Sequence, residues 1–184
     1  GPRTKLFFIL AAVVMIAFSS LPAAGQAFTP ARIAVIDSDA FNHKTAGITR
    51  MVKTITALNA EFKPTQDEIN RLADQAKSLQ KEIEALYSTA APTTIRAKGD
   101  TLEQLQRDIK RKSENAQEAF DRRQKIVMEP VLTDISNAIE AYAKKRGIDI
   151  VIDLAKFDGV YLYNDAVNIT AAFIADYNTK TATP

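Results

Sequence analysis

The chain has 184 residues, of which 46% are hydrophobic and 25% charged, and its formal net charge is only +2. This small charge gives no support to nucleic-acid binding, and the absence of cysteine excludes a disulfide framework. A single histidine leaves few of the ligands that zinc prefers. We therefore expect no metal, no cofactor and no nucleic-acid partner, and a fold held together by packing or oligomerisation.

Residues 1–27 have the pattern of a secretory signal peptide. Two cations precede the apolar run Leu6–Phe18, and small residues follow it. The run is shorter than the ~20 residues that a membrane-spanning helix needs, so we expect cleavage after Gly25 or Ala27 rather than an uncleaved anchor. Removal of this segment takes away two cations and no acid, which leaves the remaining chain formally neutral.

A short strand and then a long helical repeat follow. Residues 32–37 are β-branched and apolar at alternate positions, as in a strand. From Ile48 to Leu86 apolar residues recur in steps of three and four, the a/d repeat of a coiled coil, and only Thr65 in this stripe is polar. Gly47 lies at the entry to the repeat, where a small residue allows the chain to bend.

Pro64 lies inside this repeat and predicts a kink. The a/d pattern continues beyond it, which favours one continuous helix. The alternative is a break, with Pro64 in the first turn of a new helix. Small and β-branched residues at 88–94 then predict the turn at which the chain reverses.

A second amphipathic stretch, Leu102–Tyr142, runs back from this turn. Lys112 and Arg123 interrupt its apolar stripe, and Pro130 predicts a second kink. Two long helices joined by a short polar turn form an antiparallel hairpin. We therefore expect a helical coiled-coil arm over residues 44–129.

The C-terminal part reads as strands followed by a helix. Gly147 ends the long helix, and residues 148–154 are a strand. Asp158-Gly159 predicts a hairpin turn into a returning strand at 160–163. Asn168-Ile169-Thr170 then caps a helix over 171–177, and residues 179–184 are expected to form a loose tail.

The predicted fold class is α+β, with the arm projecting from a β-rich base made by residues 28–43 and 130–178. Three short strands have too little core to form a stable sheet alone, so strands of several copies would close into one small barrel. The residues expected to form this oligomeric base are Ile33, Val35, Ile150, Ile152, Val160 and Leu162. The expected hinges of the arm are Gly47, Pro64 and Pro130.

In this order the segments resemble the Skp/OmpH family of periplasmic chaperones. The resemblance is carried by the strand Ile33–Asp37, Gly47 before the charged coiled coil, Glu129-Pro130-Val131, the run Lys145–Asp153, Val160–Tyr163 and Asn168-Ile169-Thr170. It implies a homotrimer whose short strands form a small β-barrel and whose arms surround a cavity. It also implies an ATP-independent holdase, not an enzyme, which is exported to the periplasm of a Gram-negative bacterium and delivers unfolded outer-membrane proteins for assembly.

The alternative function is a periplasmic coiled-coil scaffold or adaptor that bridges envelope proteins. Its arm and base would have the same sequence pattern. Suppression of aggregation distinguishes the holdase, whereas a defined partner bound at fixed stoichiometry would favour the scaffold.

Two groups of arm residues are candidates for contact with an unfolded protein. The apolar group is Leu79, Ile83, Leu86, Tyr87, Ile95, Leu102 and Leu105, although packing within the hairpin is the favoured role for most of them. The cationic group at the arm tip is Lys77, Lys81, Arg96, Lys98, Arg107, Lys110, Arg111 and Lys112. The same stretch also contains five acidic residues, so its net charge is only +3. We therefore expect at most weak attraction to acidic chains, a membrane surface or lipopolysaccharide.

No residue pattern indicates catalysis. His43 is expected to be a surface or packing residue, and the carboxylates of the arm fall on its solvated face.

Overall fold

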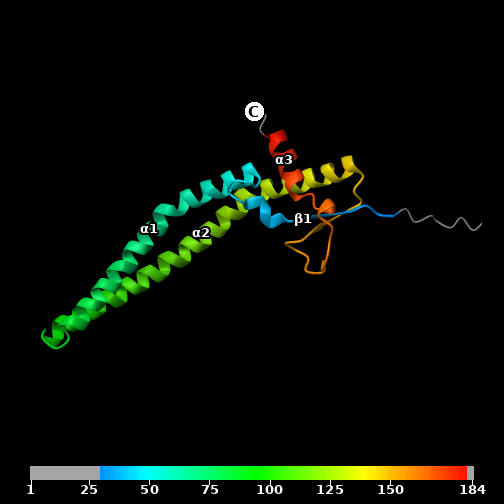
Figure 1. Ribbon diagram of the computed structural model, residues 1–184. Coiled ribbons are helices and arrows are strands. Elements are labelled where there is room, and N and C mark those ends of the chain that lie inside the picture. Colours follow the sequence, from blue (N-terminus) through cyan, green and yellow to red (C-terminus); the bar gives the residue numbers. More distant parts are fainter. Residues whose placement is uncertain (1–29, 182–184) are drawn as a thin grey trace, which may run out of the picture. The chain divides into compact units, whose positions relative to one another are not determined.

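The computed structural model describes residues 30–181, so the expected signal peptide lies outside the described part (Figure 1). The elements are β1 (Ile33–Ile36), the 3₁₀ turn η1 (Ser38–Asn42), α1 (Thr49–Leu86), α2 (Pro92–Arg146), β2 (Ile150–Asp153), the 3₁₀ turn η2 (Asp165–Val167) and α3 (Thr170–Thr181).

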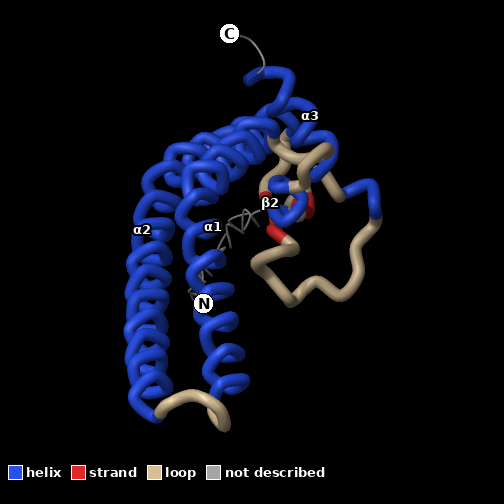
Figure 2. Tube along the Cα trace, turned by 90° about the vertical axis from the view of Figure 1, so that its left-hand side faces the viewer, coloured by secondary structure: helices blue, strands red, loops and turns tan. Residues whose placement is uncertain are grey.

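The two long helices form the predicted antiparallel hairpin. α1 and α2 run side by side in both views and are joined by a short loop at residues 87–91 (Figures 1 and 2). Leu58 and Ala76 of the predicted stripe are buried, whereas Thr65 is exposed. Phe62 of α1 packs edge to face on Phe120 of α2, with ring centroids 5.2 Å apart. The a/d stripe therefore forms the seam between the two helices.

The prolines do not break the helices. α1 continues through Pro64 and α2 through Pro130, which confirms the continuous helix and makes the alternative break at Pro64 wrong. α2 begins at Pro92, inside the range 88–94 predicted for the turn. Proline suits a first helical position because its missing amide hydrogen would have no intrahelical acceptor there.

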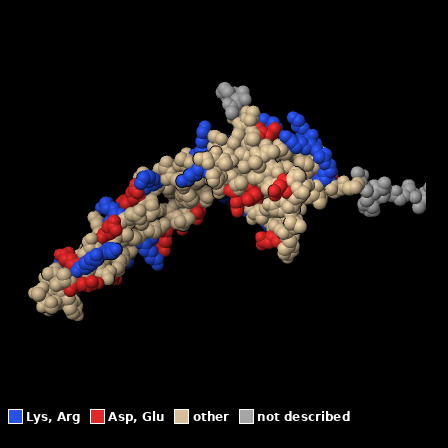
Figure 3. Space-filling view, in the orientation of Figure 1, with Lys and Arg blue, Asp and Glu red and all other residues tan. Residues whose placement is uncertain are grey.

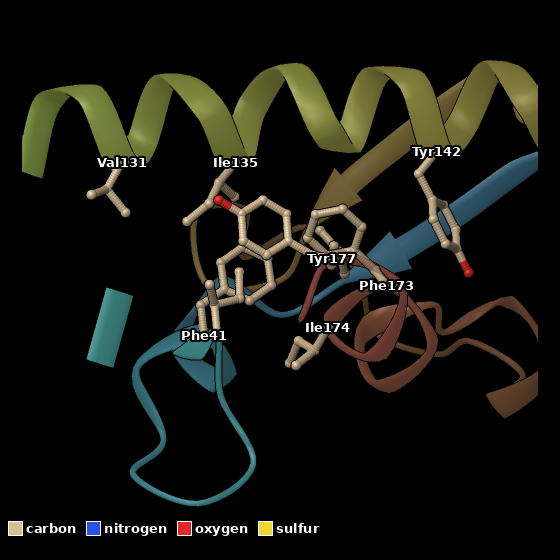
Figure 4. Close-up of a cluster of buried hydrophobic side chains, with 9 residues drawn as sticks. Phe41, Val131, Ile135, Tyr142, Phe173, Ile174 and Tyr177 are labelled. Atoms are coloured by element: carbon tan, nitrogen blue, oxygen red, sulfur yellow. The ribbon is translucent and has the colours of Figure 1, made fainter. Parts of the chain in front are cut away.

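A compact core lies where the hairpin joins the base. Its side chains come from β1, η1, the start of α1, the C-terminal part of α2 and α3 (Figure 4). Phe173 is central, because its ring lies 5.8 Å from Phe41, 5.5 Å from Tyr142 and 6.0 Å from Tyr177. The last third of α2 thus belongs to the base as much as to the arm.

The strand pair is small and parallel. β1 pairs with β2 in the register Ile33↔Ile150 to Ile36↔Asp153. The helical hairpin is the connection between the two strands. Ile33 and Ile150, opposite each other at one end of the pair, are each about half exposed, at 47% and 46%.

The predicted third strand at 160–163 is absent. Residues 160–164 form a loop in which Tyr161 is 99% and Leu162 91% exposed. Turns lie at residues 154–156 and at the predicted Asp158-Gly159. The Asp153 carboxylate accepts hydrogen bonds from the backbone N–H groups of Ser38 and Ala155 at 3.0 and 3.1 Å, which fixes the first of these turns at the end of β2. The chain therefore leaves the sheet directly after β2, and no hairpin forms.

The C-terminal helix is longer than predicted. α3 begins at Thr170, whose N–H donates to the Asn168 side chain at 3.0 Å, and it continues to Thr181. The loose tail is therefore wrong for residues 179–181, while 182–184 lie outside the described part. Lys180 forms an ion pair with Asp176 one turn earlier, at 2.6 Å, which supports the added turn.

The predicted end of the long helix is confirmed. Gly147 has φ 63° and ψ 35°, the left-handed conformation that favours glycine. Its N–H bonds to the carbonyl of Lys144 at 3.2 Å.

Candidate functional site

The described residues offer no metal centre and no membrane span. Within residues 30–181 no group of three or more histidine, cysteine, aspartate or glutamate side chains could hold a metal ion. None of the helices in this range is long and apolar enough to cross a bilayer. His43 has a local role, since its Nδ1 accepts a hydrogen bond from the Ala46 N–H at 3.3 Å.

Most of the apolar candidates lie in the hairpin seam. Six of them are partly buried: Leu79, Ile83, Leu86, Ile95, Leu102 and Leu105. Tyr87 differs, because it lies in the loop at the tip and is 76% exposed. The geometry therefore leaves one large apolar side chain of this group free for a partner.

The cationic tip is largely neutralised by acids of the same hairpin. Lys98 pairs with Glu82 across the two helices at 2.8 Å. Four further candidates also form ion pairs, within α2 or across to α1: Arg107, Lys110, Arg111 and Lys112. Among residues 30–181, only Lys77, Lys81 and Arg96 of the eight have no ion-pair partner. Lys, Arg and acidic side chains accordingly alternate along the hairpin in Figure 3.

The two cations that interrupt the stripe of α2 bridge the helices. Arg123 contacts Glu61 of α1 at 3.1 Å, and Lys112 contacts Glu68 of α1 at 3.0 Å. The sequence alone shows only a fault in the apolar stripe. In the hairpin each cation finds an acid on the facing helix.

Between these two ion pairs the helices enclose a groove of about 570 Å³, which we call the mid-arm groove. Its apolar side chains are Phe62, Ile69, Ala116 and Phe120. Its polar side chains include Thr65, Gln66, Ser113 and Gln117. Sequence reasoning missed this groove, although Thr65, the one polar residue of the stripe, lies beside Pro64 and marks its position.

The base exposes several further apolar side chains. Besides Ile33 and Ile150, the loop that follows β2 exposes Phe157, Tyr161 and Leu162. The other expected base residues lie deeper: Val35 is buried, and Ile152 and Val160 are half-buried. Val35 is thus covered by this chain itself, whereas Ile33, Ile150 and Leu162 offer surface to a partner.

Gly47 lies in a tightly packed turn. A Cβ atom at this position would come within 2.4 Å of the Phe41 carbonyl oxygen and 2.5 Å of the His43 carbonyl oxygen. The turn is further held by the Gly47 N–H, which donates to the His43 carbonyl at 2.8 Å. Close packing therefore explains the glycine here.

Comparison with known protein families gives a match that spans both the arm and the base. A protein-family model described as "Outer membrane protein (OmpH-like)" matches residues 32–177. The chain belongs to the OmpH-like family. This assignment confirms the resemblance found in the sequence, and the two long helices with one small strand pair are the fold of this OmpH-like chain.

One solved structure is similar to the OmpH-like chain at low identity. It is a candidate outer membrane chaperone (OmpH-like) from Caulobacter crescentus CB15, with 18% sequence identity and a TM-score of 0.45. The match covers 83% of this chain and 86% of that chain. The search of curated proteins found no match. The family assignment rests on the family model alone.

Proposed function

We propose that this protein is an ATP-independent holdase of the periplasm that keeps unfolded outer-membrane proteins soluble and assists their delivery for assembly. The observation that carries the proposal is the match to the OmpH-like family over residues 32–177, which span the hairpin arm and the base. An unfolded outer-membrane protein is called the client below. Export by a cleaved signal peptide within residues 1–27 is part of this proposal.

The base is proposed to assemble three copies. A parallel strand pair is normally covered on both faces, yet Ile33 and Ile150 of this pair are about half exposed. The exposed side chains of Tyr161 and Leu162 lie in the loop that follows β2. Packing of these surfaces against those of two further copies would cover them and remove the open strand edges.

The arm is proposed to hold the client through many weak contacts. Three arms set around one base would enclose a space lined by mixed apolar and charged side chains. Such contacts keep an unfolded chain soluble without ordering it, which spares the entropy that a single bound pose would cost. Tyr87 and the unpaired cations Lys77, Lys81 and Arg96 are the candidates at the tip, with weak attraction to lipopolysaccharide or a membrane surface as a further proposal.

The test is light scattering of a denatured porin diluted into buffer, with and without this protein, while its mass is measured by multi-angle light scattering. We expect suppressed aggregation by a species of three times the monomer mass. A protein that leaves the porin aggregating, but binds one folded envelope protein at fixed stoichiometry, would instead be a scaffold.

The cationic tip is tested by salt. If charge contributes to client binding, the affinity falls between low and high ionic strength, because exposed charges are screened. An affinity that is independent of salt would show that the tip cations only solubilise the arm.

A further inference from the structure

We propose that the mid-arm groove binds an uncharged aromatic side chain of an extended client strand. This inference rests on the proposed holdase function and assigns a specific contact to the middle of the arm. The client contacts expected from the sequence lie instead near the tip, between Leu79 and Leu105.

The groove has an aromatic and aliphatic lining of suitable size. Phe62 and Phe120 meet edge to face with centroids 5.2 Å apart, and Ile69 lies further along α1. The volume of about 570 Å³ falls within the ~300–1,000 Å³ typical of ligand sites. Aromatic rings prefer such edge and offset contacts, so a further ring can join this pair.

Charge in and around the groove is already neutralised. Arg123–Glu61 and Lys112–Glu68 flank it, and Lys63 on its rim bonds to Asp67 at 2.7 Å. An anionic or cationic ligand would find no unpaired opposite charge among these groups. The lining therefore favours an uncharged occupant.

The rim of the groove presents hydrogen-bond acceptors. The amide nitrogens of Gln66 and Gln117 donate to Asn70 at 3.0 Å and to Asp121 at 2.7 Å. No donor within residues 30–181 bonds to the side-chain oxygens of these two glutamines. They can accept the backbone N–H groups of an extended chain, which an unfolded strand leaves unpaired.

These features together match the strands of outer-membrane proteins. In the folded barrel these strands alternate apolar with polar residues and carry aromatic residues near the membrane interfaces, and the unfolded client contains the same sequence pattern. An aromatic side chain from one strand would enter the groove while its backbone runs along the glutamine oxygens.

The test fills the groove with leucine side chains introduced by substitution. The protein that carries both substitutions is called the filled variant. Thr65→Leu and Ser113→Leu place apolar side chains in the seam, so we expect a higher melting temperature together with weaker client binding. The matched controls are Ala60→Leu and Asn115→Leu, which add the same side chains at exposed positions outside the groove. A folding defect would lower both the melting temperature and client binding. It is therefore distinguished from a filled groove, which raises the melting temperature while it weakens binding.

The chain contains no tryptophan, so a tryptophan in a peptide reports on the peptide alone. The probe is an extended peptide of about ten residues with alternating apolar and polar residues and one central Trp. We expect its emission to shift to shorter wavelength with the unchanged protein and the controls. With the filled variant, binding should weaken roughly tenfold.

Several results would overturn the inference. One is a filled variant that binds the peptide as tightly as the unchanged protein, and another is an unchanged protein that suppresses porin aggregation without shifting the peptide emission. In both cases the holdase function would stand. A filled variant with altered oligomer mass would make the groove an interface between copies, and failure of the unchanged protein to suppress porin aggregation would end both proposals.

Discussion

The hydroxyl of Tyr177 donates a hydrogen bond to the Asp134 carboxylate at 2.5 Å, and so joins the C-terminal helix α3 to the C-terminal part of α2. Arg50, at the start of α1, contacts the same carboxylate at 2.9 Å. One carboxylate thus connects all three helices at the root of the arm. Asn178 strengthens this junction, because its side chain accepts from the Thr49 N–H and donates to the Gly47 carbonyl at 2.9 and 3.0 Å.

Replacing Tyr177 with phenylalanine removes this hydrogen bond but keeps the buried ring. We expect Tyr177→Phe to lower the free energy of unfolding by about 1 kcal/mol, because Asp134 is partly exposed and keeps its contact with Arg50. Urea unfolding followed by circular dichroism measures the change. Tyr87→Phe is the control, since Tyr87 lies at the arm tip and is 76% exposed, and it should have no effect.

The same hydroxyl predicts a dependence of stability on pH. Burial first, and then the hydrogen bond to Asp134, raise the pKa of Tyr177 above its ordinary value of 10.0. The folded protein therefore keeps this proton at pH values at which the unfolded chain loses it. The contribution of the Tyr177 hydroxyl to the free energy of unfolding is fully present below pH 10 and is lost as the pH rises above 10. The difference in unfolding free energy between the unchanged protein and Tyr177→Phe should shrink above pH 10. A difference that stays constant to higher pH would contradict this assignment.

Two glycines should respond to alanine with opposite signs. Gly47→Ala places a methyl group against backbone atoms of Phe41 and His43, so we expect clear destabilisation, by about 2 kcal/mol or more. Gly99 lies inside α2, and a Cβ atom added there would meet no atom within 4 Å, so Gly99→Ala should stabilise the helix by up to about 1 kcal/mol. Thermal unfolding of both variants tests the pair.

The hinge role of the prolines is a prediction that needs a distance measurement. The double substitution Pro64→Ala and Pro130→Ala restores two backbone N–H donors inside the helices. A proline inside an ordinary helix lowers the stability of that helix by ~3 kcal/mol. We expect a narrower spread of arm positions and a narrower range of client sizes. The chain has no cysteine, so spin labels on Thr89→Cys report distances between tips directly. Unchanged distances and client range would reject the hinges.

The proposed trimer predicts a sensitive base. Ile150 is 46% exposed beside Ile33, and Ile150→Lys would bury a charge if three copies meet at this surface. We expect the mass measured by multi-angle light scattering to fall from three copies to one. Tyr87→Lys at the exposed arm tip is the control and should leave the mass unchanged. A trimer that survives Ile150→Lys would place the interface elsewhere.

The sequence by itself determined the hairpin, because its signal is local and repeated. The a/d steps from Ile48 to Leu86 fix which face of α1 packs, and their continuation past Pro64 predicts that the helix does not break. The glycine after Arg146 fixes the end of α2 in the same way. The family resemblance also follows from the order of these segments.

Only the tertiary structure decided what depends on contacts between distant residues. Asp153 accepts a hydrogen bond from the backbone N–H of Ser38, far away in the sequence, and the expected strand at 160–163 is a loop that pairs with neither β1 nor β2. Lys112 and Arg123 look like faults in a stripe until the facing helix supplies Glu68 and Glu61. The mid-arm groove likewise exists only between two helices, since neither helix alone encloses a volume. Periodicity specifies which face of a helix is apolar. Tertiary packing decides which partner covers this face and where the partner leaves a gap.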